Sequence, residues 1–148
     1  MLRVVLDTVV FVRALLNPKS RCGRLFFEKA GDYELVVSPE IVKEVLEVIR
    51  RPEIASKSPH FNEVNFQLVL SCFAGADVVE PAEKVTVCRD PADDKFIECA
   101  LTGNAQFIVS EDNDLKDLKR YGGVRIISSA EFLRMLDEGF TGDSAQDL

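Results

Sequence analysis

Short apolar runs alternate with amphipathic segments along the whole chain. The runs are rich in β-branched residues and end at polar or turn residues, which predicts buried strands. Strands are expected over residues 2–6, 33–37, 78–79, 106–109 and 124–127, with a possible extra strand over 85–87. Helices are expected over residues 8–16, 20–30, 38–50, 62–74, 90–101 and 129–137, with a connection over 52–61. Strands that alternate with helices form right-handed βαβ units, so we expect a parallel sheet covered on both faces.

Two of the helix starts carry a capping residue followed by proline, at Ser38-Pro39 and Asp90-Pro91. Proline is favoured at the first helical position because its fixed φ suits the helix. The chain has 148 residues, which is the size of one ordinary domain. We expect a single domain over residues 1–138 and a frayed polar tail over residues 139–148.

The composition is that of a globular protein, with 47% hydrophobic and 29% charged residues. The N-terminal apolar run is interrupted by Asp7 and Thr8, unlike a signal peptide. Elsewhere no apolar run approaches the ~20 residues that a membrane span needs. These features predict a cytoplasmic protein.

The counts of histidine and cysteine narrow the possible chemistry. The one histidine, His60, lies in a polar stretch, which argues against a Ser-His or Cys-His nucleophilic mechanism. The four cysteines are widely spaced and form no C-x-x-C pair, so we expect small buried side chains rather than a zinc site. Catalysis would then use carboxylates, lysines or hydroxyls, with metals that prefer oxygen ligands.

The net charge of −7 by itself argues against nucleic-acid binding, because phosphates attract a basic surface. That argument weakens if several acids converge on bound cations. Asp7 directly follows the first expected strand, and Asp112 closely follows the fourth. In parallel sheets the sites lie outside the carboxyl ends of the strands, so both acids are expected at one sheet edge.

Acids from two helices are candidates for the same edge. Glu44 borders the apolar stripe of its expected helix and so points nearer the protein body than a fully exposed residue. In D-P-A-D-D-K, Asp90 is the expected cap, and helical periodicity leaves both Asp93 and Asp94 open as the inward acid. Taken alone, each acid also fits a cap or a surface role. Clustered together, they would repel unless cations such as Mg²⁺ or Mn²⁺ neutralised them.

Several segments together resemble one known family, the PIN-domain ribonucleases, which include many toxins of toxin–antitoxin pairs. The segments are L-D-T-V-V-F-V (6–12), S-P-E-I-V-K-E-V (38–45), R-R-P (50–52), D-P-A-D-D-K-F-I (90–97), V-S-E-D-N-D-L (109–115) and I-I-S-S-A-E-F-L (126–133). The resemblance implies a three-layer α/β/α sandwich with a central parallel β-sheet. It also implies a site for one or two Mg²⁺ or Mn²⁺ ions, a homodimer and, for a toxin, a small antitoxin partner.

Matched by motif, the family's acids fall on Asp7, Glu44, Asp94 and Asp112, with Asp114 as a frequent fifth metal ligand. The resemblance thus prefers Asp94 to Asp93. Ser110 matches a family Thr or Ser that can support the site by a hydrogen bond. Two residues depart from the family pattern. Val9 replaces a usual Asn, which predicts a looser Asp7 loop, and Glu111 replaces a common Gly, which predicts extra negative charge beside the metals.

The resulting hypothesis is metal-dependent hydrolysis of single-stranded RNA, in which a metal-activated water attacks the phosphodiester. Thr8 and Ser110 would support the acids. Candidate phosphate contacts are Arg13, Lys19, Arg21, Arg24, Lys116, Lys119 and Arg120.

Three alternatives stay open. One is a catalytically decayed PIN-like module that binds RNA or protein, although a dead site has no need of mutually repelling acids. Another is an aspartate-based phosphatase of the haloacid-dehalogenase kind, which wants a second Asp where this chain has Val9. The third is glycoside hydrolysis by two carboxylates, which the absence of tryptophan disfavours.

Overall fold

The structure is a computed structural model, and it describes residues 1–57 and 63–140. The strands are β1 (Leu2–Leu6), β2 (Tyr33–Val37), β3 (Asp77–Val78), β4 (Phe107–Val109), β5 (Arg120–Tyr121) and β6 (Val124–Ile127). The helices are α1 (Thr8–Leu16), α2 (Arg21–Phe27), α3 (Pro39–Ile49), α4 (Pro52–Ala55), α5 (Glu63–Ala74), α6 (Asp94–Thr102), α7 (Asn113–Lys116) and α8 (Ser129–Asp137). Two 3₁₀ turns are η1 (Ala30–Asp32) and η2 (Pro91–Asp93).

The strands form a six-stranded sheet in the order β3-β2-β1-β4-β6-β5. All neighbouring pairs are parallel except β5 with β6. The chain builds outward from β1 in one direction through β2 and β3, and then returns to place β4 on the other side of β1. The order therefore reverses between β1 and β4, which is where open α/β sheets form their binding crevice.

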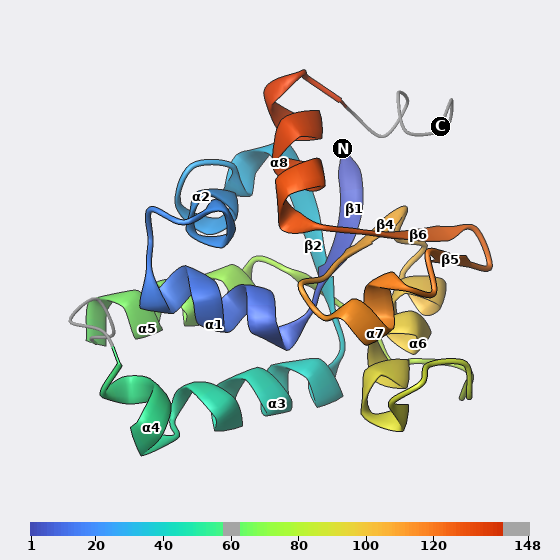
Figure 1. The fold of residues 1–148 in the computed structure, drawn as a ribbon, viewed down its shortest axis with the longest axis horizontal. Helices are drawn as coiled ribbons and strands as arrows, with labels where there is room; N and C mark the ends of the chain where they lie inside the picture. Colours follow the sequence, from blue (N-terminus) through green and yellow to red (C-terminus); the bar gives the residue numbers. More distant parts are fainter. Residues whose placement is uncertain (58–62, 141–148) are drawn as a thin grey trace.

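Helices cover both faces of this sheet, as a three-layer α/β/α sandwich requires. In Figure 1, α1, α2 and α5 lie on one side of β1 and β2, whereas α6 and α7 lie on the other. Helix α1 packs against α2, α3 and α5, and α6 packs against β1, β2 and β4. The expected fold class is confirmed.

The core explains why the central strands are nearly continuous apolar runs. Val4, Val5 and Ile108 are fully buried, because strands of a parallel sheet are covered on both faces. The expected cap also forms at α3, where the Ser38 side chain accepts a hydrogen bond from the Ile41 N–H and Pro39 occupies the first turn. Among the described helices, none is long and apolar enough to cross a membrane.

The structure differs from the sequence prediction at several short segments. The expected helix over 20–30 ends at Phe27 and is followed by the turn η1. Residues 85–87 form no strand, and the helix expected from Asp90 begins with the turn η2 before α6. The short elements α4, α7 and β5 were not predicted, since four residues or fewer carry too little periodicity. His60, the helix start at Asn62 and residues 141–148 lie outside the described residues.

A close backbone approach makes Gly23 a sensitive position in α2. A Cβ atom there would lie 2.2 Å from the Pro18 carbonyl oxygen, whereas a Cβ at Gly31 would meet nothing within 4 Å. We expect Gly23→Ala to lower the free energy of unfolding by about 2–3 kcal/mol, because backbone must shift to relieve the overlap. Gly31→Ala is the matched control and should be close to neutral in urea unfolding. Equal effects of the two substitutions would contradict the packing of α2 described here.

Candidate active site

The ends of β1 and β4 meet at the point where the strand order reverses, and Asp7 lies there. The register pairs Leu6 with Val109, and the Asp7 N–H donates to the Val109 carbonyl at 3.0 Å. Asp7 also caps α1, since its Oδ1 accepts from the Val10 N–H at 2.9 Å. The chain thus turns from strand to helix around this one carboxylate.

The Asp7 carboxylate is 3% exposed and is held from several directions. Its Oδ2 accepts from the Ser110 hydroxyl at 2.5 Å and from the Glu111 N–H at 3.2 Å. Burial raises the pKa of Asp7, and the hydrogen bond from Ser110 opposes that rise. These bonds fix the Asp7 loop although Val9 replaces the usual Asn, so the structure does not show the looser loop that was expected.

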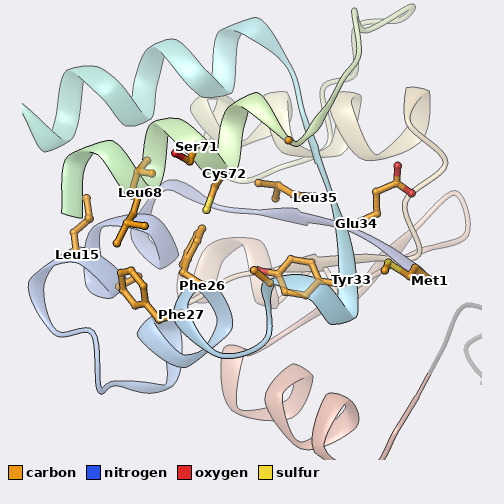
Figure 2. Close-up of a pocket in the computed structure, with 14 residues that line it drawn as sticks. Met1, Leu15, Phe26, Phe27, Tyr33, Glu34, Leu35, Leu68, Ser71 and Cys72 are labelled. Carbon is orange, nitrogen blue, oxygen red and sulfur yellow. The ribbon is translucent and has the colours of Figure 1, made fainter. Parts of the chain in front are cut away.

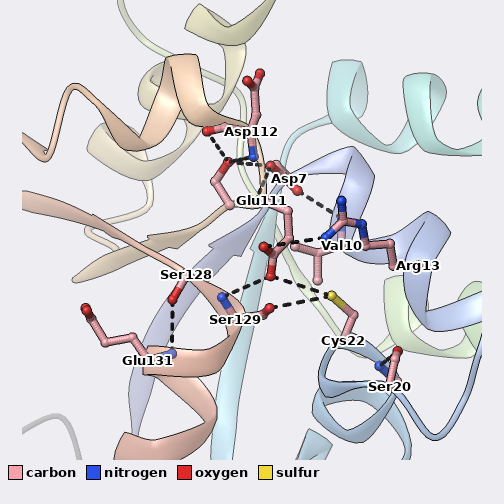
Figure 3. A network of polar contacts seen from close by, with 12 residues as sticks. Asp7, Val10, Arg13, Ser20, Cys22, Glu111, Asp112, Ser128, Ser129 and Glu131 are labelled. Atoms are coloured by element: carbon pink, nitrogen blue, oxygen red, sulfur yellow. Dashed lines mark hydrogen bonds and ion pairs between the residues drawn. The ribbon is translucent and has the colours of Figure 1, made fainter.

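Asp112 is joined to Asp7 through the same hydroxyl. The Asp112 N–H donates to the Ser110 Oγ at 2.9 Å, so Ser110 bridges the two acid positions (Figure 3). Asp112 caps the short helix α7, where its Oδ1 accepts from the Asp114 N–H at 3.0 Å. The expected meeting of Asp7 and Asp112 at one edge of the sheet is therefore present.

Asp93 is a further acid near Asp7 and Asp112. Burial raises the pKa of Asp93 to about 7, and the neighbouring carboxyl groups of Asp112, Asp90 and Asp7 contribute to the rise. Within the described part of the chain, Asp93 Oδ2 is buried without a hydrogen-bond partner. Asp93 thus lies near the other two acids, and one of its carboxylate oxygens accepts no hydrogen bond.

Asp94 instead holds the segment that precedes its helix. Its Oδ1 accepts from the Val87 N–H at 3.2 Å and the Cys88 N–H at 2.9 Å, and the residue is 7% exposed. Two further acceptors follow at four-residue spacing along α6: Glu98 accepts from the Val85 N–H and Thr102 from the Ala82 N–H, both at 3.0 Å.

This row of acceptors gives Asp94 a structural role that the motifs did not predict, and Asp93 is a further acid at the same edge. Side chains four residues apart share one helix face. Residues 82–88 form no strand, so their N–H groups have no partners in the sheet, and this face of α6 supplies acceptors for four of them, of which the Asp94 carboxylate accepts two. Helical periodicity detects which residue is buried but not what it contacts. Asp94 is buried because its carboxylate accepts the backbone N–H groups of residues 87 and 88.

Glu44 reaches the edge of the cluster from α3. Its Oε1 accepts from the Lys95 Nζ at 2.8 Å, and its Oε2 accepts from the Thr8 hydroxyl. Thr8 follows Asp7, and Lys95 lies two residues after Asp93. Glu44 is therefore placed beside the aspartates, as expected, through a lysine contact that the sequence analysis missed.

Two other acids near the cluster form ion pairs with arginines. The Glu111 carboxylate accepts from the Ser129 N–H at 3.3 Å and lies 3.6 Å from an Arg13 guanidinium nitrogen (Figure 3). Asp114, the expected fifth ligand, forms an ion pair with Arg89 at 3.0 Å. Arg13 partly compensates the extra charge expected from Glu111, which still contributes to raising the pKa of Asp7. Arg24, a candidate phosphate contact, is itself paired with Glu28 at 2.7 Å.

The carboxylate oxygens of the aspartates are ligands that suit a divalent cation, although the side chains are not arranged as a formed metal site. In the described residues, no group of three or more His, Cys, Asp or Glu side chains is arranged so that it could hold a metal ion. Asp7, Asp93 and Asp112 nevertheless supply oxygen ligands only, and the buried Oδ2 of Asp93 has no partner from the protein. All-oxygen donor sets of this kind suit Mg²⁺ and Mn²⁺.

Comparison with known proteins defines the class of this chain. The family model of the PIN domain matches residues 3–114, so the chain belongs to the PIN domain family. PIN domains are generally nucleases that use divalent metal ions.

Two individual proteins are similar to this chain. An uncharacterized protein of Methanocaldococcus jannaschii, MJ1680, is 34% identical over 123 residues, covering 80% of this chain and 76% of that protein. The crystal structure of VapBC2 from Rickettsia felis bound to a DNA fragment from their promoter contains a chain of the same fold. That chain matches with a TM-score of 0.54 and 15% identity, over 84% of this chain and 97% of the other.

Asp93, the N-cap residue of α6, and Asp94, its first residue, give opposite predictions for stability. Asp94→Ala should lower the free energy of unfolding by about 2–3 kcal/mol, because two backbone N–H groups lose a charged acceptor. Asp93→Asn should raise it in the presence of EDTA near pH 8. The pKa of Asp93 rises from 3.8 to about 7 on folding, so wild-type stability falls as the pH increases through this range.

Urea unfolding in EDTA at a series of pH values checks both expectations. The advantage of Asp93→Asn should shrink toward pH 4, where the wild-type carboxyl is also neutral in the folded state. Two results would contradict the roles assigned to these residues. One is a lower free energy of unfolding for Asp93→Asn at pH 8, and the other is an unchanged free energy of unfolding for Asp94→Ala.

Proposed function

We propose that this protein is a metal-dependent endoribonuclease that hydrolyses phosphodiester bonds of single-stranded RNA in the cytoplasm. The observation that carries the proposal is the group of Asp7, Asp93 and Asp112 at the reversal point of a PIN-domain sheet. Membership of the PIN domain family supports nuclease chemistry. The choice of RNA over DNA comes from the resemblance of the sequence motifs.

Asp7, Asp93 and Asp112 are the proposed metal ligands. A bound Mg²⁺ or Mn²⁺ ion would supply Lewis acidity and lower the pKa of an attached water. Asp7 presents its carboxylate in a fixed direction because Ser110, Glu111 and Val10 all donate to it. Thr8 supports the site by holding Glu44, and Glu44 is placed to orient water or accept a proton at the edge of the cluster.

Asp94 and Asp114, which the family motifs match to metal ligands, receive other roles in this proposal. The contacts of Asp94 support a role in positioning, because its Oδ1 already accepts two backbone bonds. Asp114 is engaged by Arg89, whose exposed guanidinium could approach RNA phosphate. An aspartate-based phosphatase fits less well, because exposed Val9 stands where such an enzyme needs its acid/base.

Cleavage of labelled single-stranded RNA with Mn²⁺ or Mg²⁺ tests the function and the assignment together. We expect EDTA to abolish cleavage, and Asp7→Asn, Asp93→Asn and Asp112→Asn each to lower it at least about 100-fold, because each removes a metal ligand. Asp94→Asn retains an oxygen that can accept the two backbone bonds, so more activity should survive. Asp32→Asn, an exposed acid before β2, is the matched control and should cleave like wild type.

Two outcomes would contradict these assignments. An inactive Asp94→Asn beside an active Asp93→Asn would return the ligand role to Asp94. Wild-type protein that binds no Mn²⁺ in calorimetry and cleaves no RNA would favour a decayed binding module instead.

A partner protein is the second part of the proposal: the chain acts as the toxin of a toxin–antitoxin pair. An apolar cavity of about 470 Å³ supports it, at the end of the sheet opposite to the acids. Figure 2 shows Phe26 and Phe27 of α2 facing Leu68 and Cys72 of α5 across this cavity. Phe27 and Leu68 are 37% and 42% exposed, so an apolar segment of a small antitoxin could cover them.

Substitution at the cavity rim tests this partner. The chain would be co-expressed with the small protein encoded beside its gene and purified through a tag on the chain. Leu68→Glu should weaken co-purification at least about 10-fold, since a buried charge opposes apolar docking. Val78→Glu is the matched control, because Val78 is an exposed apolar residue outside the cavity. Equal loss with both variants, or no captured partner with wild type, would contradict docking here.

The homodimer that the motifs imply remains a proposal that sedimentation of the purified chain would test.

A further inference from the structure

Lys95 is a buried cation at the edge of the aspartate group, and none of the sequence motifs assigned it a role. Its side chain is 10% exposed. The Nζ donates to Glu44 Oε1 at 2.8 Å and to the Ala92 carbonyl at 2.6 Å. The amine therefore connects the start of α6, where Asp93 lies, to Glu44 on α3.

The location of Lys95 opposes its charge in two ways. It is the second residue of α6, and a helix N-terminus disfavours cations. Its side chain is also largely withdrawn from water, which costs free energy unless a partner compensates the charge. Lys84, which pairs with Glu98 of the same helix at 3.8 Å, keeps 84% of its side chain exposed. Lys84 therefore forms its ion pair without losing contact with water. Lys95 loses most of that contact, so its burial needs a specific explanation.

We propose that Lys95 is a positioning residue that fixes Glu44 beside the metal ligands and neutralises its charge. The proposal rests on the nuclease function proposed above and deepens it. With Lys95 on one oxygen and the Thr8 hydroxyl on the other, Glu44 cannot swing into the aspartate group. Three aspartates then hold the cation, while the neutral Lys95–Glu44 pair keeps one carboxylate oriented toward the reacting water.

Metal binding gives a test that does not depend on activity. In Mn²⁺ calorimetry at one fixed pH, Lys95→Met should tighten binding about 3- to 10-fold, because Glu44 is left as an uncompensated negative charge. Glu44→Gln should weaken binding by a similar factor, because Lys95 is left uncompensated. The double variant should return to within about 2-fold of wild type, since both charges of the pair are gone. Lys84→Met is the matched control and should not change the affinity.

RNA cleavage adds a readout that a purely structural role would not move. Lys95→Met should lower kcat about 10- to 100-fold with KM within about 3-fold, and Lys95→Arg should restore most of kcat, because the guanidinium can still hold Glu44. In the Glu44→Gln background, Lys95→Met should have no further effect on kcat.

Three results would overturn the proposal. One is unchanged Mn²⁺ affinity in Lys95→Met, and another is unchanged kcat. The third is an equal loss of kcat from Lys95→Met with and without Glu44, which would show that the lysine acts independently. If wild type cleaves no RNA, the nuclease proposal fails, and the Mn²⁺ titrations still decide the role of Lys95.

Discussion

The hydrogen bond from the Ser110 hydroxyl to the Asp7 carboxylate joins the carboxyl ends of the two central strands. Both groups are almost completely buried, so water cannot substitute for either partner. The same carboxylate caps α1, and the same hydroxyl accepts from the Asp112 N–H. The directions of α1 and of the turn into α7 therefore depend on one contact. The Asp7 carboxylate is thus oriented by the fold itself.

Placing further acids beside that contact opposes the stability of the fold. Asp7 and Asp93 both have raised pKa values, and in both cases burial is the largest cause. The opposing stabilisation comes from a parallel sheet whose central strands are buried on both faces and from helices that cover it on each side. In the proposed nuclease, a bound divalent ion would reduce the repulsion between these carboxylates.

The sequence predicted which strand ends form this site, but it could not determine the contacts of each acid there. Apolar runs and strand-end acids placed Asp7 and Asp112 correctly at one edge, because strand direction alone determines which residues meet there. Periodicity could not separate Asp93 from Asp94, since their difference lies in long-range partners: the backbone of residues 87 and 88 for one, and Asp112 for the other. The Lys95 contact with Glu44 joins residues 51 positions apart, and no local pattern records it.

Counting the partners of each acid separates two kinds of carboxylate around the sheet edge. Asp94 and Glu98 are buried and bonded to backbone N–H groups, and Glu111 bonds the Ser129 N–H, so these three acids complete the protein's own hydrogen bonding. Asp93 is different because its Oδ2 is buried with no partner in the described chain. An unsatisfied buried oxygen is costly, and a water molecule or an ion is one of the ways in which such a group is completed. That difference, rather than burial or sequence position, supports the proposal that Asp93 holds the metal and that Asp94 belongs to the scaffold.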